Sequence, residues 1–372
     1  MKVGLVPLLY DEYNYGGVLQ FYALQKVLKN NNIECGIIFF DNNEIVSRCE
    51  LKGAKKIMIA AKSGVSRILH KRANCILNEK MFSRCQKIDQ FKKKYYSQVL
   101  NAKNISYKDY DAIICGSDQI WNPGWARRRA FLEFVPDDTK KIIYAASLGC
   151  ESLSDTQKEQ FKWRIERLQN VSVREVSGKT ILDEFIENIE IKVVLDPTLL
   201  LLPNEWLEIV KEPKEKNYIF TYFLGKYDDK IDYIRKFADK NNLKIINIPF
   251  ASGEKNDEVD FGDVKITDAD PGEFIGLIKN AEYIFTDSFH ACVFSVLFKK
   301  EFFAFQRDNN NRMQGRINTL LHNFKLPDRF INIETNLDAM KINYEMNDIL
   351  QMELRKDSLN FLLGSIREDM SN

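Results

Sequence analysis

Residues 286–290 (TDSFH) combine a titratable imidazole with the features of an anion-binding site. The apolar run 283–285 predicts a buried strand before them, and the apolar run 291–298 predicts a helix after them. His290 would then lie at the helix N-terminus, with Ser288 or Thr286 as a cap, where free N–H groups and the helix dipole favour an anion. An imidazole beside a bound anion can donate and accept protons near neutral pH. The alternative for His290 is a structural histidine beside an apolar helix.

Arg174 is a second candidate, because it follows the strand predicted over residues 171–173. An arginine at a strand end can receive a carboxylate or a phosphate, since its planar guanidinium binds two oxygens at once. The alternative is a surface ion pair between Arg174 and Glu175.

Residues 14–17 (NYGG) separate the strand predicted over residues 3–6 from the helix predicted over residues 18–30. Gly16 and Gly17 would let the backbone approach a ligand closely, and the helix N-terminus would offer N–H groups to an anion. A tight turn without a ligand explains the same residues, and spacing alone leaves both interpretations open.

Residues 116–122 (GSDQIWN) directly follow the buried strand predicted over residues 112–115. Asp118 and Gln119 would supply hydrogen bonds to a sugar, and Trp121 would supply a surface on which the sugar stacks. Alternatively, Asp118 caps the next segment and Trp121 belongs to the core. The concentration of polar side chains at one strand end favours a binding site.

The elements that position these loops alternate between short apolar runs and helical periodicity, which predicts an α/β fold with parallel sheets. We expect two Rossmann-like βα domains, residues 1–203 and 204–343, facing a cleft in a GT-B-like arrangement. Residues 344–372 are expected to form a C-terminal helix that packs back on the first domain. In such sheets ligands bind outside the carboxyl ends of the strands, where the four loops lie.

Composition narrows the class of protein. The chain has 372 residues, 45% of them hydrophobic, with 54 Lys and Arg against 53 Asp and Glu. It is therefore not a disordered chain, and its near-neutral charge argues against a nucleic-acid-binding protein. Seven scattered cysteines without a C-x-x-C pair indicate reduced thiols, and the widely spaced histidines predict no metal site. The sequence shows no signal peptide and no long apolar run, so we expect a cytoplasmic protein.

Charge is unevenly distributed, because residues 51–94 hold thirteen Lys and Arg with only two acidic residues. Interleaved apolar residues predict a pair of basic amphipathic helices inserted into the first domain. Either this insertion has a solvated basic face, or it contacts an anionic membrane surface and holds the protein on the inner face of the membrane.

The ordered set of loops resembles the polysaccharide pyruvyl transferase family. The matching segments are NYGG, GSDQIWNP, SVRE, LDPTLLL and TDSFHACVFSVLF, which together span about residues 1–305. The resemblance implies transfer of pyruvate from phosphoenolpyruvate to two hydroxyls of a sugar, with formation of a cyclic ketal and release of phosphate. It implies no cofactor besides this donor. The acceptor would be a sugar of a bacterial-type surface polysaccharide or of its lipid-linked precursor.

The resemblance also assigns roles to single residues, with the acceptor on the first domain and the donor on the second. It makes His290 catalytic. The donor-binding residues that it implies are Arg174, Ser288, Phe289 and Arg307, and the acceptor-binding residues are Asn14, Gly16, Gly17, Asp118, Gln119 and Trp121.

Two positions depart from the family pattern. Relatives often have Asp where this chain has Gly17, and they commonly have Arg where this chain has Ser288. Arg307, Arg312 or Arg316 could replace the missing arginine in space. Two other functions therefore stay open: a GT-B glycosyltransferase that uses a nucleotide-sugar, and a non-catalytic carbohydrate-binding relative.

Overall fold

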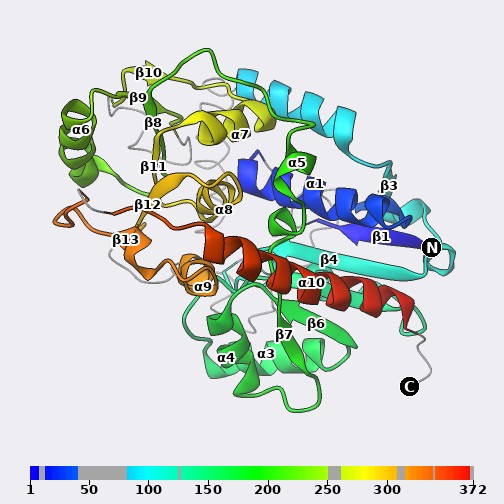
Figure 1. The fold of residues 1–372 in the computed structure, drawn as a ribbon. Coiled ribbons are helices and arrows are strands. Elements are labelled where there is room, and N and C mark those ends of the chain that lie inside the picture. The colour runs from blue at the N-terminus through cyan, green and yellow to red at the C-terminus, as the bar shows by residue number, and fades with distance from the viewer. Residues whose placement is uncertain are drawn as a thin grey trace, which may run out of the picture.

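The computed structural model describes residues 1–7, 13–40, 82–124, 126, 128–249, 261–307, 315–337 and 340–368. Two parallel sheets with helices packed on their faces make up the molecule (Figure 1). The predicted α/β class with two Rossmann-like domains in a GT-B-like arrangement is confirmed. Segments 41–81 and 308–314, which include most of the basic insertion and Arg312, lie outside the described residues.

The first sheet has seven parallel strands in the order β3-β2-β1-β4-β5-β6-β7. Its strands are β1 (Lys2–Val6), β2 (Glu34–Phe39), β3 (Val99–Asn101), β4 (Ala112–Asp118), β5 (Lys141–Ala146), β6 (Asn170–Val173) and β7 (Ile191–Val193). Its helices include α1 (Tyr15–Asn30), α3 (Asp155–Ile165) and α4 (Val176–Asp183). The chain moves outward from β1 in one direction and then from β4 in the other. This doubly wound order places the expected ligand position at the carboxyl ends of β1 and β4.

The second sheet repeats this arrangement with six strands in the order β10-β9-β8-β11-β12-β13. Its strands are β8 (Tyr218–Tyr222), β9 (Lys244–Asn247), β10 (Val264–Lys265), β11 (Tyr283–Thr286), β12 (Glu301–Phe305) and β13 (Phe330–Ile331). Its helices include α6 (Ile231–Lys240), α7 (Pro271–Asn280), α8 (Phe289–Leu297) and α9 (Gly315–Asn323), and the short helix α5 (Pro203–Trp206) precedes it. The switch point of this sheet lies between β8 and β11.

Some predicted boundaries were wrong. Strand β4 continues to Asp118, so residues 116–118 belong to the strand and not to a loop after it. Helix α9 was not predicted, although its buried Ile317, Leu320 and Leu321 follow helical spacing.

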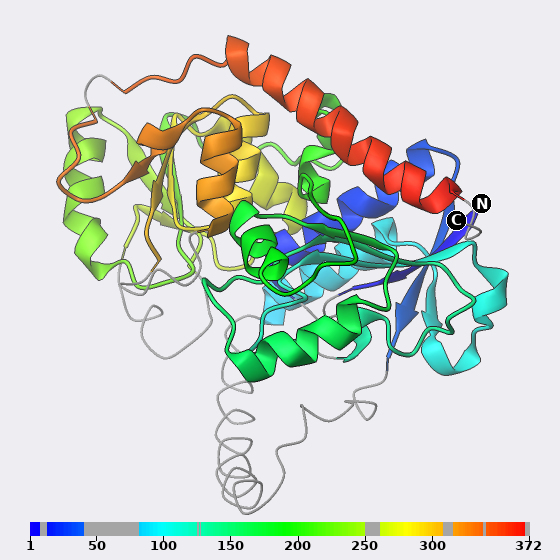
Figure 2. The ribbon, with the colours of Figure 1, turned by 90° about the horizontal axis from the view of Figure 1, so that it is seen from below.

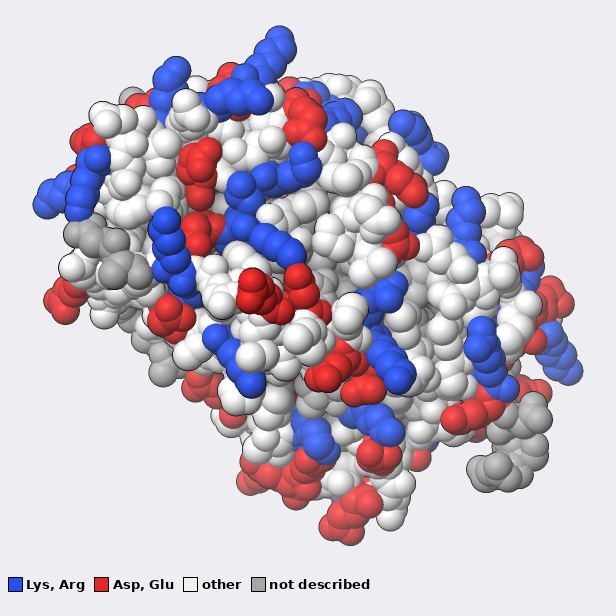
Figure 3. Space-filling view, viewed as in Figure 1, with Lys and Arg blue, Asp and Glu red and all other residues white. Residues whose placement is uncertain are grey.

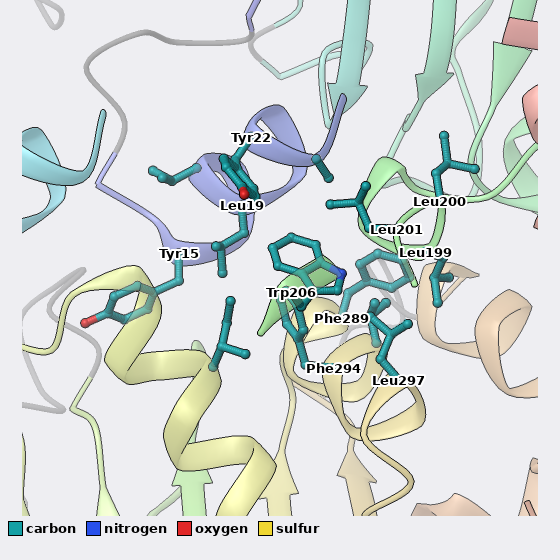
Figure 4. Close-up of a cluster of buried hydrophobic side chains, with 14 of the residues drawn as sticks. Tyr15, Leu19, Tyr22, Leu199, Leu200, Leu201, Trp206, Phe289, Phe294 and Leu297 are labelled. Atoms are coloured by element: carbon teal, nitrogen blue, oxygen red, sulfur yellow. The ribbon is translucent and has the colours of Figure 1, made fainter. Parts of the chain in front are cut away.

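A buried apolar interface joins the two domains where α1 and α7 meet α8 (Figure 4). Trp206 of α5 lies between Tyr22 of α1 and Phe294 of α8, with ring centroids 5.7 and 4.8 Å away. Tyr15 stacks on Phe274 of α7 at 4.5 Å. Because an interface of buried aromatic rings resists sliding, it fixes the positions of the two sheets relative to each other.

Helix α10 (Glu345–Arg367) also joins the domains, since it runs from the second onto the first (Figure 2). Near its start, Asp348 pairs with Lys299 of the second domain at 2.6 Å. Farther along, the Ser358 hydroxyl accepts a hydrogen bond from the Leu195 amide, and Lys140 donates to the Ile366 carbonyl. The C-terminal helix therefore packs against residues of the first domain.

The described end of the basic insertion is helical over residues 82–95, and its basic side chains contact protein. Arg84 is buried, and its guanidinium donates to the carbonyls of Thr267 and Pro249 in the second domain. Lys87 pairs with Asp268 at 2.8 Å. This end of the insertion therefore contacts the second domain, and the two roles expected for the insertion as a whole stay predictions.

The outer surface seen in Figure 3 carries basic and acidic side chains in alternation, without a broad area of one sign. Among the described residues, the helices are all too short or too polar to cross a membrane.

Candidate active site

The site lies where the carboxyl ends of the two sheets meet. Strands β4 and β6 end there from the first domain, and β11 and β12 end there from the second. The N-termini of α1, α4, α8 and α9 carry or adjoin the side chains described below. Because each helix N-terminus carries partial positive charge and free N–H groups, this convergence favours an anionic ligand.

His290 is the second residue of α8 and is only 6% exposed. Ser288 caps the helix by accepting a hydrogen bond from the Ala291 amide, which confirms the predicted cap. The imidazole packs directly on the first turn of α1, where a Cβ atom at Gly16 would overlap Nδ1. Gly16 is therefore required for the two helices to approach each other, which gives the NYGG segment a role that a simple turn does not have.

Asp196 is a site residue that the sequence analysis did not identify. It caps the single turn Pro197–Leu199 and is 1% exposed. One oxygen accepts hydrogen bonds from the amide and the hydroxyl of Thr198, at 3.0 and 2.6 Å. The other lies 2.5 Å from Arg174 Nη1 and 3.6 Å from His290 Nε2. The sequence Asp-Pro-Thr is typical of a helix start, which was the available signal, but nothing local shows that the carboxylate faces a histidine 94 positions later.

Burial alone would raise the pKa of Asp196, but Arg174, His290 and Thr198 hold it far below its ordinary value. The same balance applies to Asp118, whose pKa is lowered by Arg174, His290 and Arg316 against the effect of burial. Both carboxylates are therefore ionised at neutral pH, and they stabilise positive charge on the groups around them.

Arg174 occupies the centre of the site and is 3% exposed. Its guanidinium contacts Asp196 and Asp118 at 2.5 and 3.1 Å and lies over the ring of Phe289 at 4.5 Å. Burial would lower the pKa of Arg174, but these carboxylates raise it. The alternative of a surface pair with Glu175 is wrong, since Glu175 is also buried and accepts hydrogen bonds from the Ser147 hydroxyl and neighbouring amides.

Arg316, the second residue of α9, is 7% exposed and brings a further guanidinium to the site. With the Gln119 amide turned so that its oxygen faces the guanidinium, both Nη atoms of Arg316 donate to that oxygen, at 2.7 and 3.1 Å. Within the described ranges, no carboxylate lies within ion-pair distance of Arg316. Burial, with Arg174 and Arg307 nearby, lowers the pKa of Arg316 to about 9. Asp118 and Glu175 oppose this shift from beyond ion-pair distance, so the described residues balance the charge of Arg316 only in part.

Arg307 follows strand β12 and lies beside Asp287, and its side chain is less buried than those of Arg174 and Arg316. It donates to the Asp287 carbonyl at 3.3 Å, and its Nε is 3.8 Å from the carboxylate. That carboxylate also accepts hydrogen bonds from the amides of Leu224 and Gly225. Burial raises the pKa of Asp287, and Arg307 opposes this shift.

Four other predicted site residues have local roles in the structure. Asn14 caps α1 by accepting from the Gly16 amide, and the Gly17 carbonyl accepts from Gln20. Trp121 is fully buried, stacks on Phe131 and donates its indole N–H to the Ala130 carbonyl. It therefore belongs to the core, so the prediction of a sugar-stacking surface is wrong and the alternative interpretation of this residue was the right one. Gln119 is engaged by the guanidinium described above.

Several buried polar atoms at the site lack a hydrogen-bond partner in the described part of the chain. These atoms are Arg174 Nε, Glu175 Oε2, His290 Nε2 and Arg316 Nε. Because a buried polar atom without a partner is costly, such a group is expected where a ligand completes the hydrogen bonding. The site therefore fits a polar, anionic ligand.

Comparison with known proteins gives one family. The family model described as polysaccharide pyruvyl transferase matches residues 14–309. None of the curated proteins matches the sequence.

Solved structures with a similar chain path include two nucleotide-sugar epimerases. A putative UDP-N-acetylglucosamine 2-epimerase from Listeria monocytogenes is 10% identical, with a TM-score of 0.49, over 98% of this chain and 89% of that one. The UDP-GlcNAc 2-epimerase from Neisseria meningitidis, bound to UDP-GlcNAc, is 13% identical, with a TM-score of 0.47, over 98% of this chain and 100% of that one. At these scores the likeness does not extend to the chemistry of the site.

Proposed function

Because the chain belongs to the polysaccharide pyruvyl transferase family, we propose that it transfers pyruvate from phosphoenolpyruvate to two hydroxyls of a sugar and releases phosphate. One observation carries this proposal. Three arginines, Arg174, Arg307 and Arg316, lie near one another at the site, and Arg174 shares the Asp196 carboxylate with His290. Among the described residues, Arg316 has no carboxylate within ion-pair distance.

The donor suits this arrangement because phosphoenolpyruvate carries a carboxylate and a phosphate on adjacent groups. Arginine guanidinium groups bind both kinds of anion through paired N–H donors. The N-termini of α8 and α9 add partial positive charge on the second-domain side of the site. The positive charge on the second-domain side of the site therefore favours binding of the donor to that domain.

In the proposed reaction, His290 donates a proton to the methylene carbon of the donor, and a sugar hydroxyl forms a bond to the adjacent carbon. Phosphate leaves with the electron pair of its C–O bond, and the second hydroxyl closes the ring at the same carbon. The two hydroxyls lose two protons. One of these protons returns to His290 and replaces the proton that it gave to the methylene carbon. The other leaves with the phosphate, so the atoms and charges balance.

Asp196 assists this chemistry as a positioning residue. Its carboxylate lies 3.6 Å from His290 Nε2 and stays ionised, so it is placed to orient the imidazole toward the donor. Arg174 links this carboxylate to Asp118, which keeps both acids in place. Arg174 would bind the donor through its remaining N–H group.

For the acceptor we propose a sugar diol of a surface polysaccharide or of its lipid-linked precursor, bound on the first-domain side. Asp118 and the backbone of residues 14–17 are the groups nearest to that role. Asp118 is 7% exposed at the end of β4 and offers a carboxylate to a hydroxyl.

The test is a phosphate-release assay with phosphoenolpyruvate and a panel of sugars and lipid-linked sugar mimics, followed by mass spectrometry of the sugar. We expect phosphate release together with one ketal-linked pyruvate per acceptor, and loss of both in the His290→Asn variant. A protein that ignores phosphoenolpyruvate but consumes a nucleotide-sugar would refute the proposal in favour of a glycosyltransferase. Tight sugar binding without turnover of any donor would refute it in favour of a carbohydrate-binding protein.

A further inference from the structure

Ser288 stands where the family commonly has an arginine, and the structure gives it a different task. Its hydroxyl accepts from the Ala291 amide and so caps α8. Ser288 is 3% exposed and carries no charge for a donor. If the proposed function is correct, the positive charge lost from this position has to come from elsewhere in the site.

We propose that Arg316 takes the place of the missing motif arginine and binds an anionic group of the donor, its carboxylate or its phosphate. The identity of the donor rests on the proposed function. The anion-binding role of Arg316 is independent of that function, because it follows from the surroundings of this side chain.

The three guanidinium groups of the site differ in how their charge is balanced. Arg174 contacts two carboxylates, Asp118 and Asp196, and Arg307 lies beside the carboxylate of Asp287. Among the described residues, Arg316 has the neutral amide of Gln119 as its hydrogen-bond partner, and Asp118 and Glu175 act on it from beyond ion-pair distance. An incoming anion therefore gains most from Arg316, because each of the other two guanidinium groups already has a carboxylate within ion-pair distance.

The lowered pKa of Arg316 supports this view, since burial and two neighbouring guanidinium groups disfavour its charged form. A bound anion would relieve that cost. Arg316 Nε also lacks a hydrogen-bond partner in the described part of the chain, so the guanidinium has donor capacity left.

The backbone that carries Arg316 is fixed by contact with the first domain. The Val176 amide at the start of α4 donates to the Thr319 hydroxyl of α9 at 3.2 Å. At Gly315, a Cβ atom would overlap the Ser177 hydroxyl, so the two helix starts are in close contact. Arg316 is thereby held in place before the donor binds, which reduces the ordering cost of binding.

The experiment measures donor affinity by isothermal titration calorimetry in Arg316→Ala, Arg316→Ala/Ser288→Arg and the wild type. Loss of charge-assisted hydrogen bonds worth about 1.5–3 kcal/mol predicts that Arg316→Ala raises the dissociation constant of phosphoenolpyruvate about 10- to 150-fold. The added arginine at position 288 should recover about 10-fold or more of this loss. Arg235→Ala, which removes an arginine paired with Asp263 on the same domain, is the matched control and should bind as the wild type does.

The outcomes separate the two proposals. Wild-type binding that Arg316→Ala leaves unchanged overturns the inference alone. Absence of donor binding to the wild type overturns the proposed function, and the same titration with inorganic phosphate then tests Arg316, with weaker binding to Arg316→Ala expected. If Ser288→Arg does not restore affinity to the Arg316→Ala variant, the claim that Arg316 replaces the motif arginine is overturned. If Arg316→Ala does not fold, Arg316→Lys is used instead, because it keeps the charge but loses the paired N–H donors of the guanidinium. A donor-induced shift in Tm that is the same in Arg316→Lys and the wild type would count against the inference.

Discussion

Replacing Asp196 by Asn tests the charge network at the centre of the site. The substitution keeps the size of the side chain but removes its charge, and it puts an NH₂ group in place of one carboxylate oxygen. If the amide oxygen still accepts from Thr198, the NH₂ group faces Arg174 Nη1, which is also a donor. Arg174 then keeps only Asp118, at 3.1 Å, as a charged partner.

The size of the effect follows from burial. Removing one partner of a buried ion pair costs about 3–5 kcal/mol. Because Asp118 still balances part of the charge of Arg174, we expect the lower end of that range, about 3 kcal/mol. We expect kcat to fall about 10²–10⁴-fold, since the imidazole loses the carboxylate that lies beside it.

Urea unfolding at neutral pH measures the first quantity, and phosphate release measures the second. Asp348→Asn is the matched control, because that carboxylate is half exposed and its pair with Lys299 contributes about 1 kcal/mol or less. If Asp196→Asn lowers the free energy of unfolding no more than the control does, the charge network is refuted. An unchanged kcat would refute the role of Asp196 beside His290.

The stability difference should also depend on pH. The pKa of Asp196 is depressed in the folded state, so the stability that this carboxylate contributes is fully present above its unfolded pKa, which is about 3.9. It is lost as the pH falls below that value toward the folded pKa. The gap between Asp196→Asn and the wild type should therefore be constant near neutral pH and should narrow below about pH 4. A gap that stays the same in acid would contradict the assignment.

Two further substitutions test the surroundings of the imidazole and the core. Gly16→Ala places a methyl group on His290 Nδ1, so kcat should fall at least about 10²-fold. The control is Gly364→Ala in helix α10, where the added methyl group has no neighbour closer than 3.7 Å, so kcat should be unchanged. Trp121→Phe removes the donor to the Ala130 carbonyl, so the free energy of unfolding should fall by about 1–3 kcal/mol with the KM for the acceptor unchanged; a large rise in this KM would instead favour a sugar-stacking surface.

The fold class and the positions of the main loops could be predicted from the sequence because they depend on local patterns. Apolar runs set the strands, and ligand loops follow strand ends in parallel sheets. The cap at Ser288 was predictable for the same reason, since it depends on residues within a few positions. The strand end was misplaced at residues 116–118, where the chain leaves apolar residues but continues in the sheet between β1 and β5.

What the sequence did not reveal depends on contacts between distant segments. Polar residues near Trp121 suggested exposure, but tertiary packing against Phe131 decides its burial. Asp196 was not identified as a site residue because its local pattern is that of a helix start. Its role depends on Arg174 and His290, which come from two different sheets.

The division of charge between the domains explains why the site needs both of them. Arg174 and the carboxylates of Asp118 and Asp196 come from the first domain and the segment after β7, so this group carries one positive and two negative charges. The second domain adds the imidazole of His290 and the guanidinium of Arg316, which has no carboxylate within ion-pair distance among the described residues. An anion is therefore attracted mainly by the second domain, while the first domain places a carboxylate beside the imidazole. Separating the two sheets would leave His290 without that carboxylate and would leave Arg174 and its acids without the imidazole.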